Sequence, residues 1–299
     1  GGRHYRLRDP GFLGIGHQVV HQDAQPPAGA GRDLRHDRGQ VVDPLQELDD
    51  QQATGDELHR RYVFGGVVAG VLTQPLRDRD HARAWFEAEH RVLLAVVEHA
   101  AAAGFAVHAW QLAWALGDYL DWRGHWHDLA STARTGLDAA ERAGDRAGQA
   151  QLHRGLARAY VRLGRLGAAR DHLNRAIRFA RAVDDRVTEA NSRLGLSLVL
   201  ERRGENKEAL AHSQHALELF RATGHQAGEA RSLNAVGWYH TLLGDHTEAL
   251  ACCQRALALL KKLGSRNDLA PTLDTLGYAH HRLGHHREAA ACYRRAVRL

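Results

Sequence analysis

The 299-residue sequence contains no methionine, only three cysteines and only six prolines. Average usage predicts about six methionines in a chain of this length, including an initiator. Their absence predicts that the chain is a fragment of a longer protein. The cysteines are odd in number, and Cys252 and Cys253 are adjacent within one predicted helix, which excludes a framework of paired disulfides.

Long hydrophobic runs are missing as well. The longest apolar stretch, Tyr62 to Leu72, is interrupted by glycines at three positions, whereas a membrane-spanning helix needs roughly 20 apolar residues. The chain does not open with a basic segment followed by an apolar core, as a secretory leader would. We therefore expect a cytoplasmic protein that does not contact a membrane.

The remaining composition is that of a soluble globular protein. Hydrophobic residues make up 44%, charged residues 25% and aromatic residues 6% of the chain, which excludes collagen-like, mucin-like and wholly disordered classes. The formal charge of +5 is modest, and the basic residues are almost all arginines. We expect no direct contact with nucleic acid.

A repeat with a period of 40 residues dominates the sequence. Glycines recur at this spacing in one column formed by Gly124, Gly164, Gly204, Gly244 and Gly284. A second column is formed by Gly104, Gly144, Gly224 and Gly264, with Val183 and Asp184 where one glycine is missing. A fixed period of this length is typical of solenoid proteins, in which stacked units share one continuous core.

Each unit has the pattern of two helices joined by a short turn. The segment from Ala230 to Leu243 is apolar at helical spacing, Gly244 and Asp245 interrupt it, and the segment from Thr247 to Leu263 is helical again. Glycine suits both turns because a left-handed backbone after a helix costs least without a Cβ atom. The repeat therefore predicts an all-α fold built from helix-turn-helix units.

The repeated residues resemble the tetratricopeptide repeat family. The last unit carries Leu276-Gly277, Gly284, Ala289, Tyr293 and Ala296, which match the L-G, G, A, F/Y and A positions of that pattern. The period of 40 departs from the usual 34 of the family. The resemblance implies a right-handed superhelical solenoid over 76–299, with an entry helix at 80–103 and repeats that start near 105, 145, 185, 225 and 265.

A second resemblance concerns the segment 84–90, Ala-Trp-Phe-Glu-Ala-Glu-His, and the apolar residues that follow it. It is similar to the opening of the tetratricopeptide sensor in large actinobacterial regulators of the SARP and NB-ARC (STAND) types. This implies the ligand-sensing or interaction part of a bacterial transcriptional regulator, whose NTPase and DNA-binding modules lie upstream. No G-x4-G-K-[ST] phosphate-binding loop is present in this chain. The alternative is a stand-alone scaffold that assembles a protein complex without switching.

Residues 1–75 form a different kind of segment. Five of the six prolines lie there, together with many Asp, Gln, Arg and Gly residues and no sustained periodicity. Two interpretations stay open, an irregular linker that is partly disordered or a small folded piece that includes 62–72.

No cofactor, metal or catalytic site is predicted. His281 and His285 are four residues apart, but Gly284 interrupts the helix between them, and His125 and His127 straddle the start of a predicted helix. Solvated or groove-lining histidines are the favoured interpretation. The sequence contains no HExxH, CxxC or G-x-S-x-G motif and no recognisable set of nucleophile, base and oxyanion donor, so we expect no enzyme.

The tryptophans and two cysteines have structural and functional interpretations. Five of the six tryptophans lie between Trp85 and Trp126, where they form either an aromatic ligand platform or, as we favour, a core that seals the first units. Cys252 and Cys292 occupy the same place in successive units, and we expect both to be buried as small hydrophobic residues.

The first helix of each unit has a face that packing against the second helix does not use. In tetratricopeptide proteins this face lines a concave groove that holds a peptide or a partner helix. Its arginines favour an acidic protein or peptide, and amide side chains could hold an extended backbone. The alternative is a solvated charged face without a partner. The predicted groove residues are Trp114, Asp118, Gln151, Arg154, Arg158, Arg162, Asn191, Arg202, Arg231, Asn234, Trp238, Thr241, Asp274, Tyr278 and Arg282.

Overall fold

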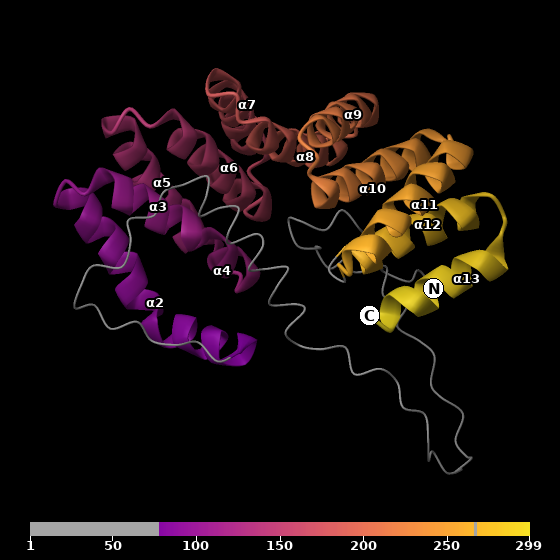
Figure 1. Cartoon of the computed structure of the whole chain (residues 1–299), viewed down its shortest axis with the longest axis horizontal. Helices are drawn as coiled ribbons and strands as arrows, with labels where there is room; N and C mark the ends of the chain where they lie inside the picture. Colours follow the sequence, from indigo (N-terminus) through magenta and orange to yellow (C-terminus); the bar gives the residue numbers. More distant parts are fainter. Residues whose placement is uncertain (1–77, 266–267) are drawn as a thin grey trace, which may run out of the picture. The chain divides into compact units, whose positions relative to one another are not determined.

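A computed structural model describes residues 78–265 and 268–299 (Figure 1). The interpretations of residues 1–75 lie outside these described ranges. Every regular element within the ranges is a helix. The helices are α2 (Arg79–Ala102), α3 (Ala106–Ala115), α4 (Gly117–Trp122), α5 (Trp126–Arg142), α6 (Arg146–Arg162), α7 (Leu166–Ala182), α8 (Arg186–Glu201), α9 (Asn206–Ala222), α10 (Gln226–Leu243), α11 (His246–Leu263), α12 (Leu269–Arg282) and α13 (His286–Val297).

The helices form five successive helix-turn-helix units that follow α2. Four of these units are the pairs α6 and α7, α8 and α9, α10 and α11, and α12 and α13. In the first unit the first helix is divided at Leu116 into α3 and α4, and α5 is the second helix. The second helix of each unit packs in turn against the first helix of the next. The predicted all-α solenoid with a 40-residue period is thereby confirmed.

The turns between helices show why glycine recurs in them. All nine turn glycines have φ between 66° and 95°, and a Cβ atom added at any of them would meet nothing within 4 Å. Backbone conformation, rather than space, therefore selects glycine there. Asp184 replaces the missing glycine and adopts the same left-handed conformation, with φ of 52°. Aspartate tolerates this region better than most residues.

Glycines within the helices have a different role, because they permit close packing. A Cβ atom on Gly237 would lie 2.7 Å from the Cys253 Sγ, and one on Gly228 would lie 2.3 Å from the Phe220 ring. Gly237 thus lets the two helices of its unit approach closely, and Gly228 lets α10 approach α9 of the preceding unit.

The core is built mainly from small and medium apolar side chains. Ala169, Ala209 and Ala249, which are related by the 40-residue period, are completely buried. The largest cluster extends from Ala157 to Tyr239 and is shared by three units. Since each buried leucine contributes about 1.5–3 kcal/mol and no unit can bury its apolar stripe alone, stacking the units stabilises the fold.

The tryptophans do not act as one group. Trp110 is fully buried and packs against Gly148, as the core interpretation predicts. Trp122 is exposed, and the Arg83 guanidinium lies 4.6 Å from its ring centroid. Cys252 and Cys292 are only half-buried, although both pack against apolar clusters. The expectation that both are buried was therefore met only in part.

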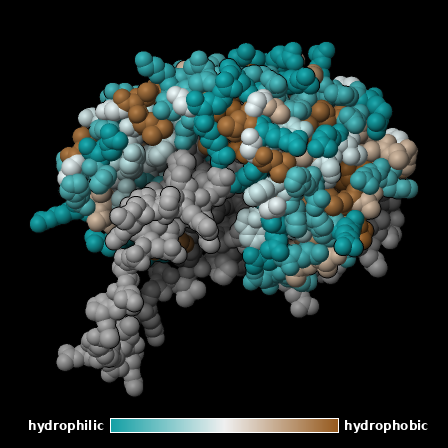
Figure 2. Space-filling model, turned by 180° about the vertical axis from the view of Figure 1, so that it is seen from behind, coloured by the Kyte–Doolittle hydropathy of each residue, from teal (hydrophilic) through white to brown (hydrophobic). Residues whose placement is uncertain are grey.

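The exterior is mixed rather than uniformly polar. The face shown in Figure 2 is largely hydrophilic, with apolar residues interspersed as smaller patches. Within the described part of the chain, no helix combines the length and hydrophobicity that crossing a bilayer requires.

Candidate binding surface

The first helices of neighbouring units contact one another directly. These contacts join α3 to α6, α6 to α8, α8 to α10 and α10 to α12, whereas the described second helices from α5 onward make no comparable contacts among themselves. The stack is therefore tighter on the side of the first helices. Most of the predicted groove residues lie on these helices, apart from Asp118 on α4 and Arg202 at the end of α8.

The 40-residue period places equivalent positions of adjacent units beside each other. Three contacts between predicted groove residues follow this rule: Asp118 with Arg158 at 2.5 Å, Asn191 with Arg231 at 3.2 Å, and Trp238 with Tyr278 at a ring-centroid distance of 5.6 Å. The structure thus joins predicted residues in a ladder of pairs between units.

At the N-terminal end of this ladder the arginines are paired with carboxylates. Arg158, whose side chain is 7% exposed, contacts the 82% exposed Asp118. Surrounding protein atoms partly desolvate the Asp118 carboxyl although its side chain is exposed, but the Arg158 guanidinium outweighs this effect and lowers the pKa of Asp118. Asp121, which the sequence analysis missed, is buried and lies 3.1 Å from the Arg162 Nε and 3.9 Å from the Arg158 Nε. These two arginines already have acidic partners within the chain.

A small recess lies between α3 and α6. Its free volume of about 10 Å³ admits about one water molecule. Gln151 crosses this region, since its Nε2 donates to the Thr188 Oγ1 at 2.7 Å and its Oε1 accepts from the Arg154 Nη2 at 3.1 Å. The lining residues are Ala113, Trp114, Gly117, Leu129, Ala133, Gln151, Leu152, Arg154, Gly155 and Arg158.

Arg231, on α10, differs from the paired arginines. Its Nη2 donates to the neutral Asn191 Oδ1 at 3.2 Å, and its guanidinium lies 6.0 Å from the Phe220 ring centroid. Its buried Nε has no hydrogen-bond partner, and no carboxylate of the described residues lies within ion-pair distance. Burial lowers the pKa of Arg231, against the opposing charges of Asp268 and Asp118. Arg231 is therefore a cation whose Nε–H is available to donate a further hydrogen bond.

Several predicted groove residues are less accessible than the sequence suggested. Thr241 is 1% exposed, and its Oγ1 donates to the Gly237 carbonyl at 2.9 Å, so its assignment to an open groove was wrong. Helical spacing alone put Thr241 on the free face, but its side chain is buried in the structure. Asn234 and Trp238 are also largely buried. Arg202 and Arg282 are exposed near the ends of their helices, and Asp274 is half-buried.

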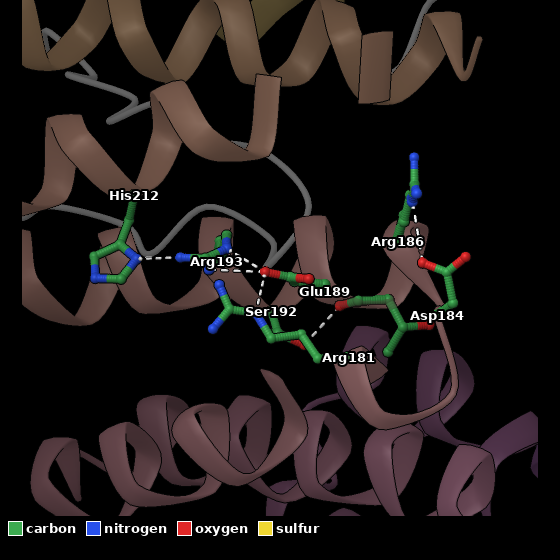
Figure 3. Close-up of polar contacts among 8 residues, drawn as sticks. Arg181, Asp184, Arg186, Glu189, Ser192, Arg193 and His212 are labelled. Atoms are coloured by element: carbon green, nitrogen blue, oxygen red, sulfur yellow. Dashed lines mark hydrogen bonds and ion pairs between the residues drawn. The ribbon is translucent and has the colours of Figure 1, made fainter. Parts of the chain in front are cut away.

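A polar network around the buried Glu189 and Arg193 joins α7, α8 and α9 (Figure 3). The Glu189 Oε1 accepts hydrogen bonds from Arg193 Nε and Arg181 Nε, each at 2.8 Å, and the Arg193 Nη1 lies 3.3 Å from the His212 Nδ1. The sequence analysis missed this network. Its only signal in the sequence is recurrence, because Arg221 bonds to Glu229 in the same way one unit later.

A histidine pair occupies the equivalent place one unit earlier. His153 on α6 is 1% exposed, and its Nδ1 lies 2.9 Å from the Nδ1 of His172 on α7. Burial, with the neighbouring His172, lowers the pKa of His153 to about 3. Two units further on, Leu233 and Cys252 take these positions. The same helix junction is thus polar in the middle of the stack and apolar towards its C-terminal end.

Repeated helix pairs with a shared core and a ladder of contacts between their first helices define an α-solenoid. A tetratricopeptide repeat model matches residues 188–262 and 239–299, and the same unit recurs from α3 onward in the structure. Residues 188–299 are therefore tetratricopeptide repeats, and the helix pairs before them continue the same fold.

Solved structures support the same fold. BtubC (BKLC) from P. vanneervenii is 22% identical, with a TM-score of 0.59 over 73% of this chain and 90% of that one. A Rap protein complexed with Competence and Sporulation Factor is 15% identical, with a TM-score of 0.58 over 85% and 71%. The apo form of RapI is 19% identical, with a TM-score of 0.55 over 62% and 68%. No curated protein sequence matches this chain.

Proposed function

We propose that the first-helix side of the solenoid binds an extended acidic peptide or protein segment. Tetratricopeptide repeats generally act as protein-binding scaffolds rather than enzymes, and the Rap protein of similar fold was solved with Competence and Sporulation Factor. Binding of this kind requires hydrogen-bond donors along the groove, and the bound peptide is not chemically changed.

The observation that carries this proposal is the state of Arg231. A ligand carboxylate would supply the negative partner that this guanidinium lacks within the described residues, through paired charge-assisted hydrogen bonds. Asn191 already orients the guanidinium, and Asn234 lies one helical turn further along α10. Arg158 and Arg162 contribute less to recognition, because Asp118 and Asp121 neutralise them.

Selection from a phage-displayed library of random 12-residue peptides tests the proposal. We expect enriched peptides to contain Asp or Glu and to bind at least about 10-fold more weakly to Arg231→Ala, the loss expected for one charge-assisted contact. Arg255→Ala is the matched control, since Arg255 is exposed on the second helix α11. A selection that enriches no peptide, or peptides that bind Arg231→Ala and wild type equally, would refute it.

We also propose that this module is the sensor of a larger bacterial regulator. The support is the 84–90 segment, which forms part of α2 directly before the first unit. Sequencing the reading frame upstream of Gly1 tests this placement. NTPase and DNA-binding modules in that frame are the expected result, whereas their absence favours the stand-alone scaffold.

A further inference from the structure

Two histidines and one aspartate converge where α2 meets α5, at the N-terminal end of the solenoid (Figure 1). His90 comes from α2, His125 is the N-cap residue of α5, and Asp128 lies in the first turn of α5. The His90 Nε2 is 3.1 Å from the Asp128 Oδ2, and the rings of His90 and His125 are 4.5 Å apart between centroids. One donor atom from each of the three residues lies within 4.8 Å of the other two.

Within this cluster, one of the two ring nitrogens of His90 has no hydrogen-bond partner. The His90 side chain is 18% exposed and that of Asp128 is 39% exposed. The Asp128 carboxylate occupies only the Nε2 side of the His90 ring. The buried Nδ1 of the same ring has no hydrogen-bond partner. The His90 Nε2 is the ring nitrogen that faces Asp128, so it is the atom that would ligate an ion shared with that carboxylate.

We propose that His90, His125 and Asp128 bind a divalent first-row transition metal ion, with Zn²⁺ as the expected occupant. Two imidazoles and one carboxylate are ligands that such ions prefer, and three protein ligands leave a fourth position for water. The site would join the entry helix α2 to the first repeat, a contact that is otherwise made by packing such as that of Phe86 on Tyr119.

The observed spacing is close to what a zinc ion requires. At bond lengths of 2.0–2.2 Å, a tetrahedral ion separates its ligand atoms by about 3.4 Å. The nitrogen and oxygen of His90 and Asp128 already meet this separation, at 3.1 Å. All three ligand atoms lie within 4.8 Å of one another, so no separation would have to shorten by more than roughly 1.4 Å. Side-chain rotation of His125, at the turn before α5, could provide this change.

Metal titration of the full chain at neutral pH tests the site. We expect one tight equivalent of Zn²⁺ by calorimetry, a visible absorption band from tetrahedral Co²⁺, and a higher thermal midpoint with Zn²⁺ present. His90→Gln and His125→Gln should each weaken Zn²⁺ binding at least 10-fold and abolish the Co²⁺ band. Even substitutions of residues that only hydrogen-bond to metal ligands typically lower metal affinity 10–100-fold.

The chain has 22 histidines, so control variants are needed to show that Zn²⁺ binds at this cluster rather than at other histidines. His127→Gln alters the same helix start outside the cluster, and His281→Gln alters a histidine near the other end of the solenoid. Both should bind Zn²⁺ as the wild type does. Asp128→Asn, which preserves the shape of the side chain, serves if a histidine variant does not fold. Absence of a tight equivalent, or equal binding by wild type and all cluster variants, would overturn the proposal.

Discussion

Asp184 is the one non-glycine residue of the described chain with a positive φ, and replacing it with glycine should stabilise the protein. A left-handed backbone costs an L-residue about 1–2 kcal/mol, and somewhat less for aspartate. Glycine removes this cost but gains conformational freedom in the unfolded chain, which offsets about 0.5–1 kcal/mol. We therefore expect Asp184→Gly to raise the free energy of unfolding by up to about 1 kcal/mol.

Contacts of the Asp184 side chain do not alter this balance much. Its carboxylate lies 3.1 Å from the Arg186 Nε, but the two side chains are 81% and 51% exposed. Exposed pairs of this kind contribute little because water and salt screen them. The variant Arg186→Ala, measured alongside, isolates the contribution of this pair.

The opposite substitution one unit later is the matched control. Gly224 has φ of 68° and open space where a Cβ atom would stand, so Gly224→Asp should cost about 1 kcal/mol through the backbone alone. Urea unfolding followed by circular dichroism measures both variants, and an unchanged m-value licenses the comparison. The thermal midpoint of Asp184→Gly should rise by up to about 4 °C. A lower midpoint for Asp184→Gly, or an unchanged stability of Gly224→Asp, would refute the reasoning.

Two further predictions concern the core. The pKa of His153 falls from 6.5 to about 3 on folding. Between these pH values only the unfolded state binds a proton at His153. The contribution of His153 to the free energy of unfolding is therefore fully present above pH 6.5 and declines as the pH falls. The double variant His153→Leu and His172→Cys carries the residues found two units later. Its unfolding midpoint should depend less on pH over this range than that of the wild type, and an unchanged pH dependence would contradict the prediction. Gly228→Ala should lower the free energy of unfolding by about 1–3 kcal/mol, because the added Cβ would overlap the Phe220 ring. Gly167→Ala is the control, since a Cβ atom there meets open space, and its thermal midpoint should be unchanged or slightly higher.

The candidate groove shows where sequence reasoning succeeded and where it stopped. The period of 40 correctly predicted the stacked helix pairs, and in the structure some equivalent positions of adjacent units meet, as Asp118 and Arg158 do. It could not show that Asp121 lies between two arginines, because that depends on the rotation and spacing of adjacent units, nor that Thr241 is buried. The choice of Arg231 over Arg158 as the ligand-binding cation likewise depends on which arginine has an acidic neighbour.

The sequence by itself determined the fold, because the two glycine columns mark where each helix must end and the apolar stripes require neighbouring units to stack. It also located the exception at Val183 and Asp184, and the structure puts the left-handed backbone at Asp184. The tertiary structure alone decided which distant side chains meet. His90 and Asp128 are 38 residues apart on helices whose packing brings them to 3.1 Å, and a one-dimensional pattern of histidines does not encode that distance.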